Sequence, residues 1–152
     1  DTEMFELFRA AGKRLLPMPP KGRTSVIHVQ DLAALLLALA TRDGGGEVYE
    51  PDDGRENGWE HGELARAIAA AVRCKAVVPR VPERLLRLAA KGDERLRGPS
   101  AKLTQDRVGY MTHPDWVSRP DRKPPRELWQ PKTDTRKGLA ETARWYEAKG
   151  WL

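Results

Sequence analysis

The 152-residue chain contains a single cysteine, Cys74, so neither an internal disulfide nor a cysteine metal cluster can form within it. Its three histidines, His28, His61 and His113, lie far apart, and none has a second histidine or cysteine at the spacing of a zinc site. No stretch is long and apolar enough to predict a membrane span, and none has the pattern of a signal peptide. We therefore predict a cytoplasmic protein with no metal site and no membrane partner.

The chain has only a small excess of positive over negative charge. The chain has 27 Lys and Arg against 22 Asp and Glu, a formal net charge of +5, and the excess lies after residue 50. A basic excess can indicate nucleic acid or another anionic ligand, so a small basic nucleic-acid or anion-binding module is one alternative. Acidic residues are interleaved with the basic ones, and no basic stripe contains aromatic residues. This mixture favours an ordinary solvated surface, and we expect no nucleic-acid partner.

The most informative stretch runs from Ser25 to Arg42. Residues 25–29 are β-branched and apolar, which is typical of a buried strand. Asp31 follows at a position suited to a helix N-cap, and Gly44–Gly46 should end the helix. Leucines recur at helical spacing on more than one face: Leu32, Leu35, Leu36 and Leu39. We therefore expect this helix to be buried on more than one side, in an α/β arrangement.

The remaining pattern predicts a helix-rich chain with short strands. Helices are expected at five further places: after a cap at Asp1 or Thr2, at 63–73, at 83–96, at 104–111, and after a cap at Thr133 or Asp134. Strands are expected at 46–51 and 76–81, the second at a sheet edge because Pro79 lacks an N–H group. The prolines of residues 17–20 exclude both a helix and a central strand, so this loop is either the stiff wall of a pocket or a surface connector.

No catalytic group of residues is recognisable. The glycines at 44–46 follow a helix and precede a strand, which is the reverse of a dinucleotide-binding turn. The acid pair Asp52–Asp53 is more typical of a turn than of catalysis. Arg23 lies in a loop before a strand, where it could present its guanidinium to an anionic substrate. Together with Met18 in the proline loop and Thr24 beside it, Arg23 is a candidate for substrate binding.

Several segments occur in a characteristic order along almost the whole chain. They are Ile27-His28-Val29 with Asp31-Leu32-Ala33, Gly46 to Gly54, Glu63-Leu64-Ala65, Glu127-Leu128-Trp129, and Gly138-Leu139 with Thr142, Trp145 and Tyr146. This order resembles the C-terminal, substrate-binding half of the extended short-chain dehydrogenase/reductase family, the NAD(P)-dependent epimerase/dehydratase group. The resemblance implies that residues 1–152 form a helix-rich α/β substrate domain with the last Rossmann strand near 46–51. Members often place an arginine four residues before the histidine, where this chain has Thr24.

In that family the glycine-rich cofactor turn and the Tyr-x-x-x-Lys catalytic pair lie in the N-terminal half. Neither occurs here, since no tyrosine of this chain has a lysine four residues later. The resemblance implies an oxidoreductase or epimerase in which NAD or NADP and the catalytic residues belong to a missing N-terminal part. This chain alone is then expected to bind no cofactor and to be inactive. It should pair with that missing half or with a second copy of itself; the alternative is a stand-alone partner-binding domain of the same ancestry.

Overall fold

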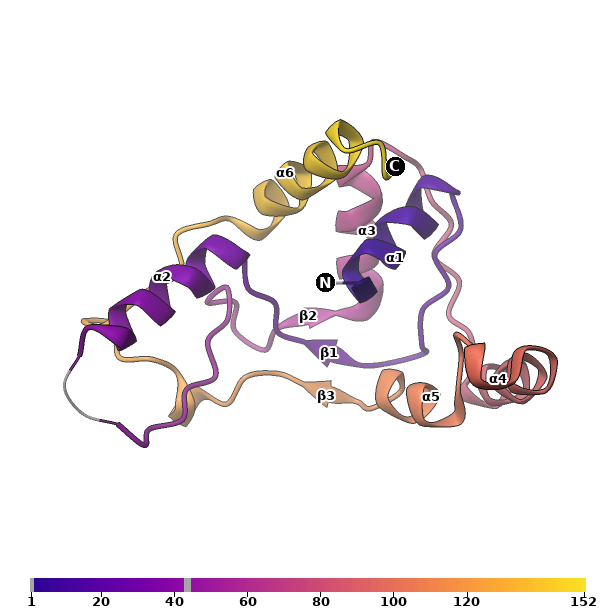
Figure 1. The fold of residues 1–152 in the computed structure, drawn as a ribbon, viewed down its shortest axis with the longest axis horizontal. Helices are drawn as coiled ribbons and strands as arrows, with labels where there is room; N and C mark the ends of the chain where they lie inside the picture. Colours follow the sequence, from indigo (N-terminus) through magenta and orange to yellow (C-terminus); the bar gives the residue numbers. More distant parts are fainter. Residues whose placement is uncertain (1, 43–44) are drawn as a thin grey trace.

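The computed structural model describes residues 2–42 and 45–152, so the predicted cap Asp1 and the helix stop at Gly44 lie outside it. Figure 1 shows a helix-rich α/β chain with three helices packed over a small sheet, one helix projecting at one end and a helical pair at the other. The elements in order are α1 (Thr2–Gly12), β1 (Arg23–Thr24), α2 (Val29–Ala40), β2 (Trp59–Glu60), α3 (His61–Ala71), α4 (Glu83–Arg97), η1 (Gly98–Ser100), α5 (Gln105–Met111), β3 (Asp115–Trp116), η2 (Pro120–Arg122) and α6 (Thr135–Ala148).

Helix α3 is the centre of the core and packs against both α1 and α6. Phe8 of α1 and Ile68 of α3 are fully buried, and the Phe8 ring meets Tyr146 of α6 edge to face at a centroid distance of 5.4 Å. The other buried members are Ala11, Leu16, Met18, Trp59, Leu64, Ala65, Ala67, Ala69, Leu139 and Ala143. The core therefore joins the beginning, middle and end of the chain.

The sheet is small and mixed, with the strand order β2-β1-β3. Strand β1 pairs antiparallel with β2, which places Arg23 opposite Glu60, and parallel with β3, which places Arg23 opposite Asp115. The predicted edge strand at 76–81 is present as two parallel bridges, Leu15 to Val77 and Met18 to Arg80. Pro79 contributes only its carbonyl, which accepts a hydrogen bond from the Met18 N–H at 3.0 Å.

Local signals place most of the helices correctly. Helix α4 begins and ends within one residue of its predicted bounds. Thr104 caps α5 by accepting a hydrogen bond from the Arg107 N–H, and Asp134 caps α6 by accepting one from the Lys137 N–H. Within the described residues, no helix is long and apolar enough to cross a membrane.

The stretch around α2 departs from its predictions. Strand β1 ends at Thr24, before the predicted strand begins, and His28 caps the helix instead of Asp31. The Asp31 carboxylate lies in the first turn and instead accepts a hydrogen bond from the Thr133 N–H at 2.9 Å. The expected burial on more than one side is also wrong: Leu35 is buried, but Leu36 and Leu37 are 58% and 69% exposed. Only one side of α2 meets other described residues.

Residues 46–51 form no strand in this structure. Their backbone makes one hydrogen bond to another segment, from the Glu50 N–H to the Arg122 carbonyl at 2.8 Å. The Val48 side chain is exposed. A strand needs a ladder of backbone hydrogen bonds to a neighbouring strand, and no described segment forms such a ladder with residues 46–51. The two unpartnered features, α2 and residues 46–51, are consecutive in the chain.

Candidate functional site

Two segments that carry the family resemblance lie against each other. The His28 ring packs on Gly138, where an added Cβ would be 2.9 Å from His28 Cδ2. The Trp129 indole N–H donates to the Asp31 carbonyl at 2.9 Å. Burial raises the pKa of Asp31, but hydrogen bonds from the Thr133 and Lys132 N–H groups outweigh it and hold that pKa below its usual value. These contacts join α2 to α6 and give the matching residues a structural role.

The acid pair Asp52–Asp53 belongs to a turn, as its residue types predict. Each carboxylate accepts a hydrogen bond from the backbone two residues later, at 2.9 Å from the Gly54 N–H and 3.1 Å from the Arg55 N–H. The second Asp52 oxygen lies 3.0 Å from Lys123 Nζ. Both acids are therefore engaged in holding loops together, which leaves neither free as a catalytic pair.

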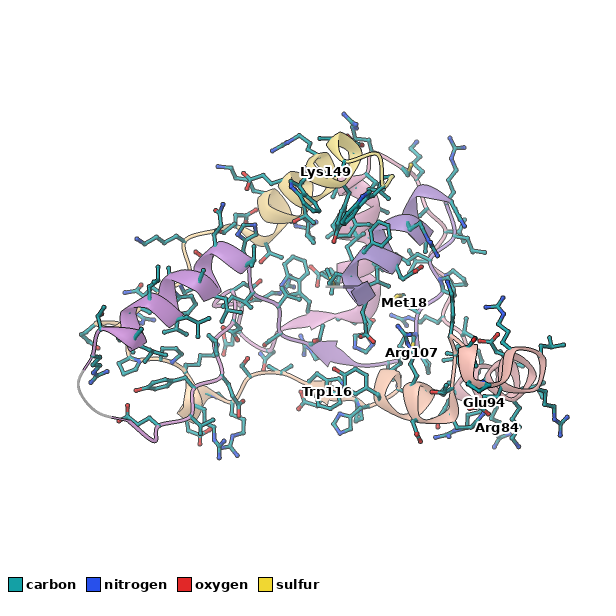
Figure 2. All side chains as sticks on the ribbon, in the orientation of Figure 1. Met18, Arg84, Glu94, Arg107, Trp116 and Lys149 are labelled. Atoms are coloured by element: carbon teal, nitrogen blue, oxygen red, sulfur yellow. The ribbon has the colours of Figure 1, made fainter. Side chains whose placement is uncertain are left out.

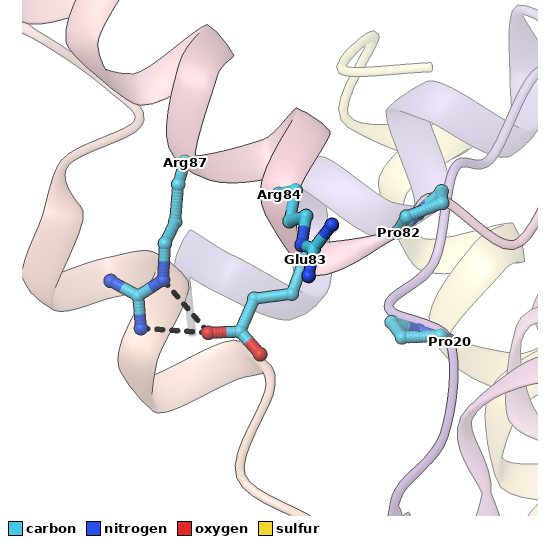
Figure 3. Close-up of a pocket in the computed structure, with 5 residues that line it drawn as sticks. All are labelled: Pro20, Pro82, Glu83, Arg84 and Arg87. Carbon is cyan, nitrogen blue, oxygen red and sulfur yellow. Dashed lines mark hydrogen bonds and ion pairs between the residues drawn. The ribbon is translucent and has the colours of Figure 1, made fainter.

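The candidate site is an open hollow of about 490 Å³ at the start of α4 (Figure 3). Pro20 forms one wall and Pro82 the other. The two walls are held in register because the Met18 carbonyl accepts a hydrogen bond from the Val81 N–H at 2.9 Å. The proline loop thus lines a pocket, which was one of its two predicted roles.

Three charged side chains of α4 complete the hollow. Arg87 pairs with Glu83 at 2.8 Å, while Arg84 makes no ion pair with any residue that the structure describes. Figure 3 shows these side chains at the open side of the two prolines. The Arg84 guanidinium is therefore left without an ion-pair partner beside two prolines and the Glu83–Arg87 pair, an arrangement suited to a carboxylate or phosphate group. Neither Arg84 nor Arg87 is among the residues that the sequence predicts to bind substrate.

The three residues predicted to bind substrate lie near this hollow without lining it. Met18 is buried in the core, on the segment between α1 and β1 (Figure 2). Arg23 is exposed in β1, at the position opposite Glu60 on one neighbouring strand and Asp115 on the other. The Thr24 hydroxyl donates to the Ser25 carbonyl at 3.1 Å. The three thus follow one another along the segment that carries Pro20, but the structure does not gather their side chains in one cavity.

His61 is a buried polar residue that the sequence did not single out. Its ring packs on Gly22, and its backbone N–H donates to the Gly22 carbonyl at 3.1 Å. The side chain is more than nine-tenths buried, and Nδ1 has no hydrogen-bond partner among the described residues. Burial lowers the pKa of His61, although the neighbouring Glu60 carboxylate raises it. No group of three or more potential metal ligands occurs in the part of the chain that the structure describes.

The free energy of unfolding should decrease as the pH is lowered, because of His61. Its pKa in the folded chain lies below the usual value of 6.5, so the unfolded chain binds the proton more readily. The free energy of unfolding is then fully present above that usual value and decreases as the pH falls through the interval below it. Urea denaturation between about pH 7.5 and about pH 5.5 should show this decrease, and His61→Gln should reduce the slope. The exposed His113→Gln is the matched control; an unchanged slope in His61→Gln would contradict the assignment.

No protein-family model matches the chain, and no curated protein matches it either. Its function is therefore inferred from its residues and their geometry.

Proposed function

We propose that residues 1–152 are the substrate-binding part of an NAD(P)-dependent oxidoreductase or epimerase of the extended short-chain dehydrogenase/reductase type. In this proposal another part of the same protein supplies the cofactor-binding turn and the catalytic residues. The order of the matching segments supports it, as does the contact between two of those segments at His28 and Gly138.

One observation carries the proposal. Helix α2 and the segment after it carry exposed apolar side chains, among them Leu36, Leu37 and Val48, and residues 46–51 have no partner strand among the described residues. In a doubly wound α/β protein a helix and the strand that follows it pack onto a larger sheet. A cofactor-binding domain seated here would cover the leucines and pair the strand. We therefore infer that this domain, rather than a second copy of the chain, is the natural occupant.

The residues of this chain determine which part of the proposed reaction it can perform. A bound nicotinamide accepts or donates hydride, and the described residues provide no turn to hold it. What they do provide is the hollow beside Pro20, where Arg84 can hold an anionic part of the substrate. Arg23 lies on the segment leading from that wall into the sheet. The proposed role of this chain is to bind and orient the substrate and to cover it from water.

A stand-alone partner-binding domain of the same ancestry remains the second candidate. The exposed leucines of α2 favour it, because they and an extended segment without a partner strand also suit a separate protein partner. The complete reading frame separates the two candidates. A glycine-rich turn and a Tyr-x-x-x-Lys pair upstream support the enzyme, whereas their absence supports the partner-binding domain.

Cofactor binding tests the proposal directly. Calorimetric titration with NADH and NADPH should give micromolar or tighter binding to the complete protein and none to residues 1–152 alone. Micromolar binding to the isolated chain would contradict the assignment of the cofactor site to another part. Failure of the complete, folded protein to bind either nucleotide would overturn the proposed function.

Arg23 should contribute to substrate binding in the complete enzyme. Replacing it with alanine should weaken transition-state binding by about 1–3 kcal/mol, the scale of a hydrogen bond to a charged group, which lowers kcat/KM about 5–150-fold. The control is Arg144→Ala, which removes another exposed arginine, on α6. An unchanged kcat/KM for Arg23→Ala across a panel of anionic substrates would identify it as an ordinary surface arginine.

A further inference from the structure

Helix α4 carries three exposed leucines on its outer side. Leu85, Leu88 and Leu96 are 56%, 66% and 87% exposed. Their spacing of three and eight residues places them in one stripe along the helix. The opposite side packs against η1 and α5, with Ala90 fully buried. These three leucines are therefore not core residues, and the part of the chain that the structure describes leaves them largely in solvent.

Basic side chains border the leucine stripe. Arg84, Lys91 and Arg95 are all exposed and are spaced seven and four residues apart, which aligns them along the helix next to Leu88. Figure 2 shows Arg84 on the outer part of this end of the molecule. The result is a helix face with an apolar stripe and a parallel basic stripe.

The acidic side chains in the middle of α4 point away from the outer face and accept backbone hydrogen bonds. The Asp93 carboxylate accepts hydrogen bonds from the Lys102 and Leu103 N–H groups at 2.7 and 2.9 Å. The Glu94 carboxylate accepts one from the Gln105 N–H at 2.9 Å. These bonds fix the start of α5, so neither acid lies in the outer stripe. The outer face is consequently more basic than the composition of the helix suggests.

We propose that the outer face of α4 binds the surface of a membrane that contains anionic lipids. Leucine side chains favour the boundary between headgroups and acyl chains, while neighbouring Arg and Lys side chains attract lipid phosphates. The 15-residue helix is too short to cross a bilayer, so it lies along the surface. The predicted absence of a membrane partner rested on the lack of a spanning segment, and this proposal revises that prediction. A nucleic acid would use the basic stripe but gain little from the leucines, which is why the bilayer is favoured.

This surface is independent of the exposed leucines of α2. Figure 1 places α2 and α4 at opposite ends of the longest axis, so a domain seated on α2 reaches α4 only by spanning the whole molecule. The proposal therefore goes beyond the proposed function and stands whether or not the chain belongs to an oxidoreductase. It would hold the substrate-binding hollow, which begins at the same helix, close to a lipid surface.

Vesicle sedimentation tests the proposal with the 152-residue chain. The chain should bind vesicles in which phosphatidylglycerol replaces about a third of the phosphatidylcholine, and should not bind phosphatidylcholine alone. Arg95→Gln should lower the partition coefficient about fivefold, which corresponds to about 1 kcal/mol for one basic residue at an anionic surface. Leu88→Gln should lower it about tenfold because one leucine no longer enters the bilayer. Raising the salt concentration should weaken binding.

Two matched variants serve as controls. Leu37→Gln changes an equally exposed leucine on α2, and Arg144→Gln changes an exposed arginine on α6; neither should alter vesicle binding. Circular dichroism of each variant would establish that it is folded before its vesicle binding is compared. Absence of binding, equal binding to both kinds of vesicle, or an equal loss with Leu37→Gln would overturn the proposal. Binding to a DNA duplex with the same dependence on Arg95, but not to vesicles, would assign the face to nucleic acid instead.

Discussion

Replacing Asp53 with alanine should lower the free energy of unfolding by about 3 kcal/mol, since a buried donor would lose its partner along with two further hydrogen bonds. One oxygen of the Asp53 carboxylate accepts from the Trp59 indole N–H at 2.7 Å and from the Thr135 hydroxyl. The other oxygen accepts from the Arg55 N–H at 3.1 Å. Trp59 is almost completely buried, so its N–H cannot turn to water. Asp53 thus links its own turn to β2 and to the first residue of α6.

Urea denaturation of Asp53→Ala and of Asp121→Ala would measure the effect. Asp121 is exposed and makes a single 3.3 Å ion pair with Arg119, so its loss should cost less than about 0.5 kcal/mol. Asp53→Asn should fall between the two, because an amide keeps one acceptor for Trp59. A change below about 0.5 kcal/mol in Asp53→Ala would show that this junction contributes little to the stability of the fold.

Gly22→Ala is expected to destabilise the chain by about 2–4 kcal/mol, through overpacking and backbone strain together. A Cβ at this position would lie 2.4 Å from His61 Cε1, and φ is +154°, where side chains are rarely tolerated. The His61 ring is buried and cannot move aside without displacing the core. Gly12→Ala is the control, because its Cβ would have no neighbour within 4 Å.

A double variant identifies the cause of that loss. If the clash with the ring is responsible, His61→Ala should restore part of the stability of Gly22→Ala, giving a coupling energy of about 1 kcal/mol or more. The comparison also covers the case in which Gly22→Ala alone fails to fold, since Gly22→Ala with His61→Ala should then fold. Strictly additive effects would assign the loss to the backbone conformation of residue 22 alone.

The sequence predicted the elements whose signals are local. Thr104 and Asp134 cap helices through bonds to residues three positions later, and the Asp52–Asp53 turn likewise closes on its own backbone. These predictions succeed because donor and acceptor lie within a few residues of each other.

The features that the sequence did not predict depend on contacts between segments that are far apart in the chain. Burial of the apolar helix α2 needs a cover from outside its own sequence, and a strand at 46–51 needs a partner strand. His61 becomes buried because Gly22, far away in the chain, leaves room for its ring. Asp31 becomes an acceptor for Thr133 instead of a cap for the same reason. No periodicity within one segment carries this information.

The arrangement of α1, α3 and α6 sets the order in which the chain can fold during its synthesis. Phe8 and Ile68 leave the ribosome before Tyr146, which closes over the Phe8 ring and is made more than a hundred positions after it. Until α6 has emerged, the apolar sides of α1 and α3 face the surroundings, a condition that invites chaperone binding or aggregation. A nascent chain stalled before residue 135 should therefore remain sensitive to protease, and protection should appear abruptly once α6 is free of the ribosome.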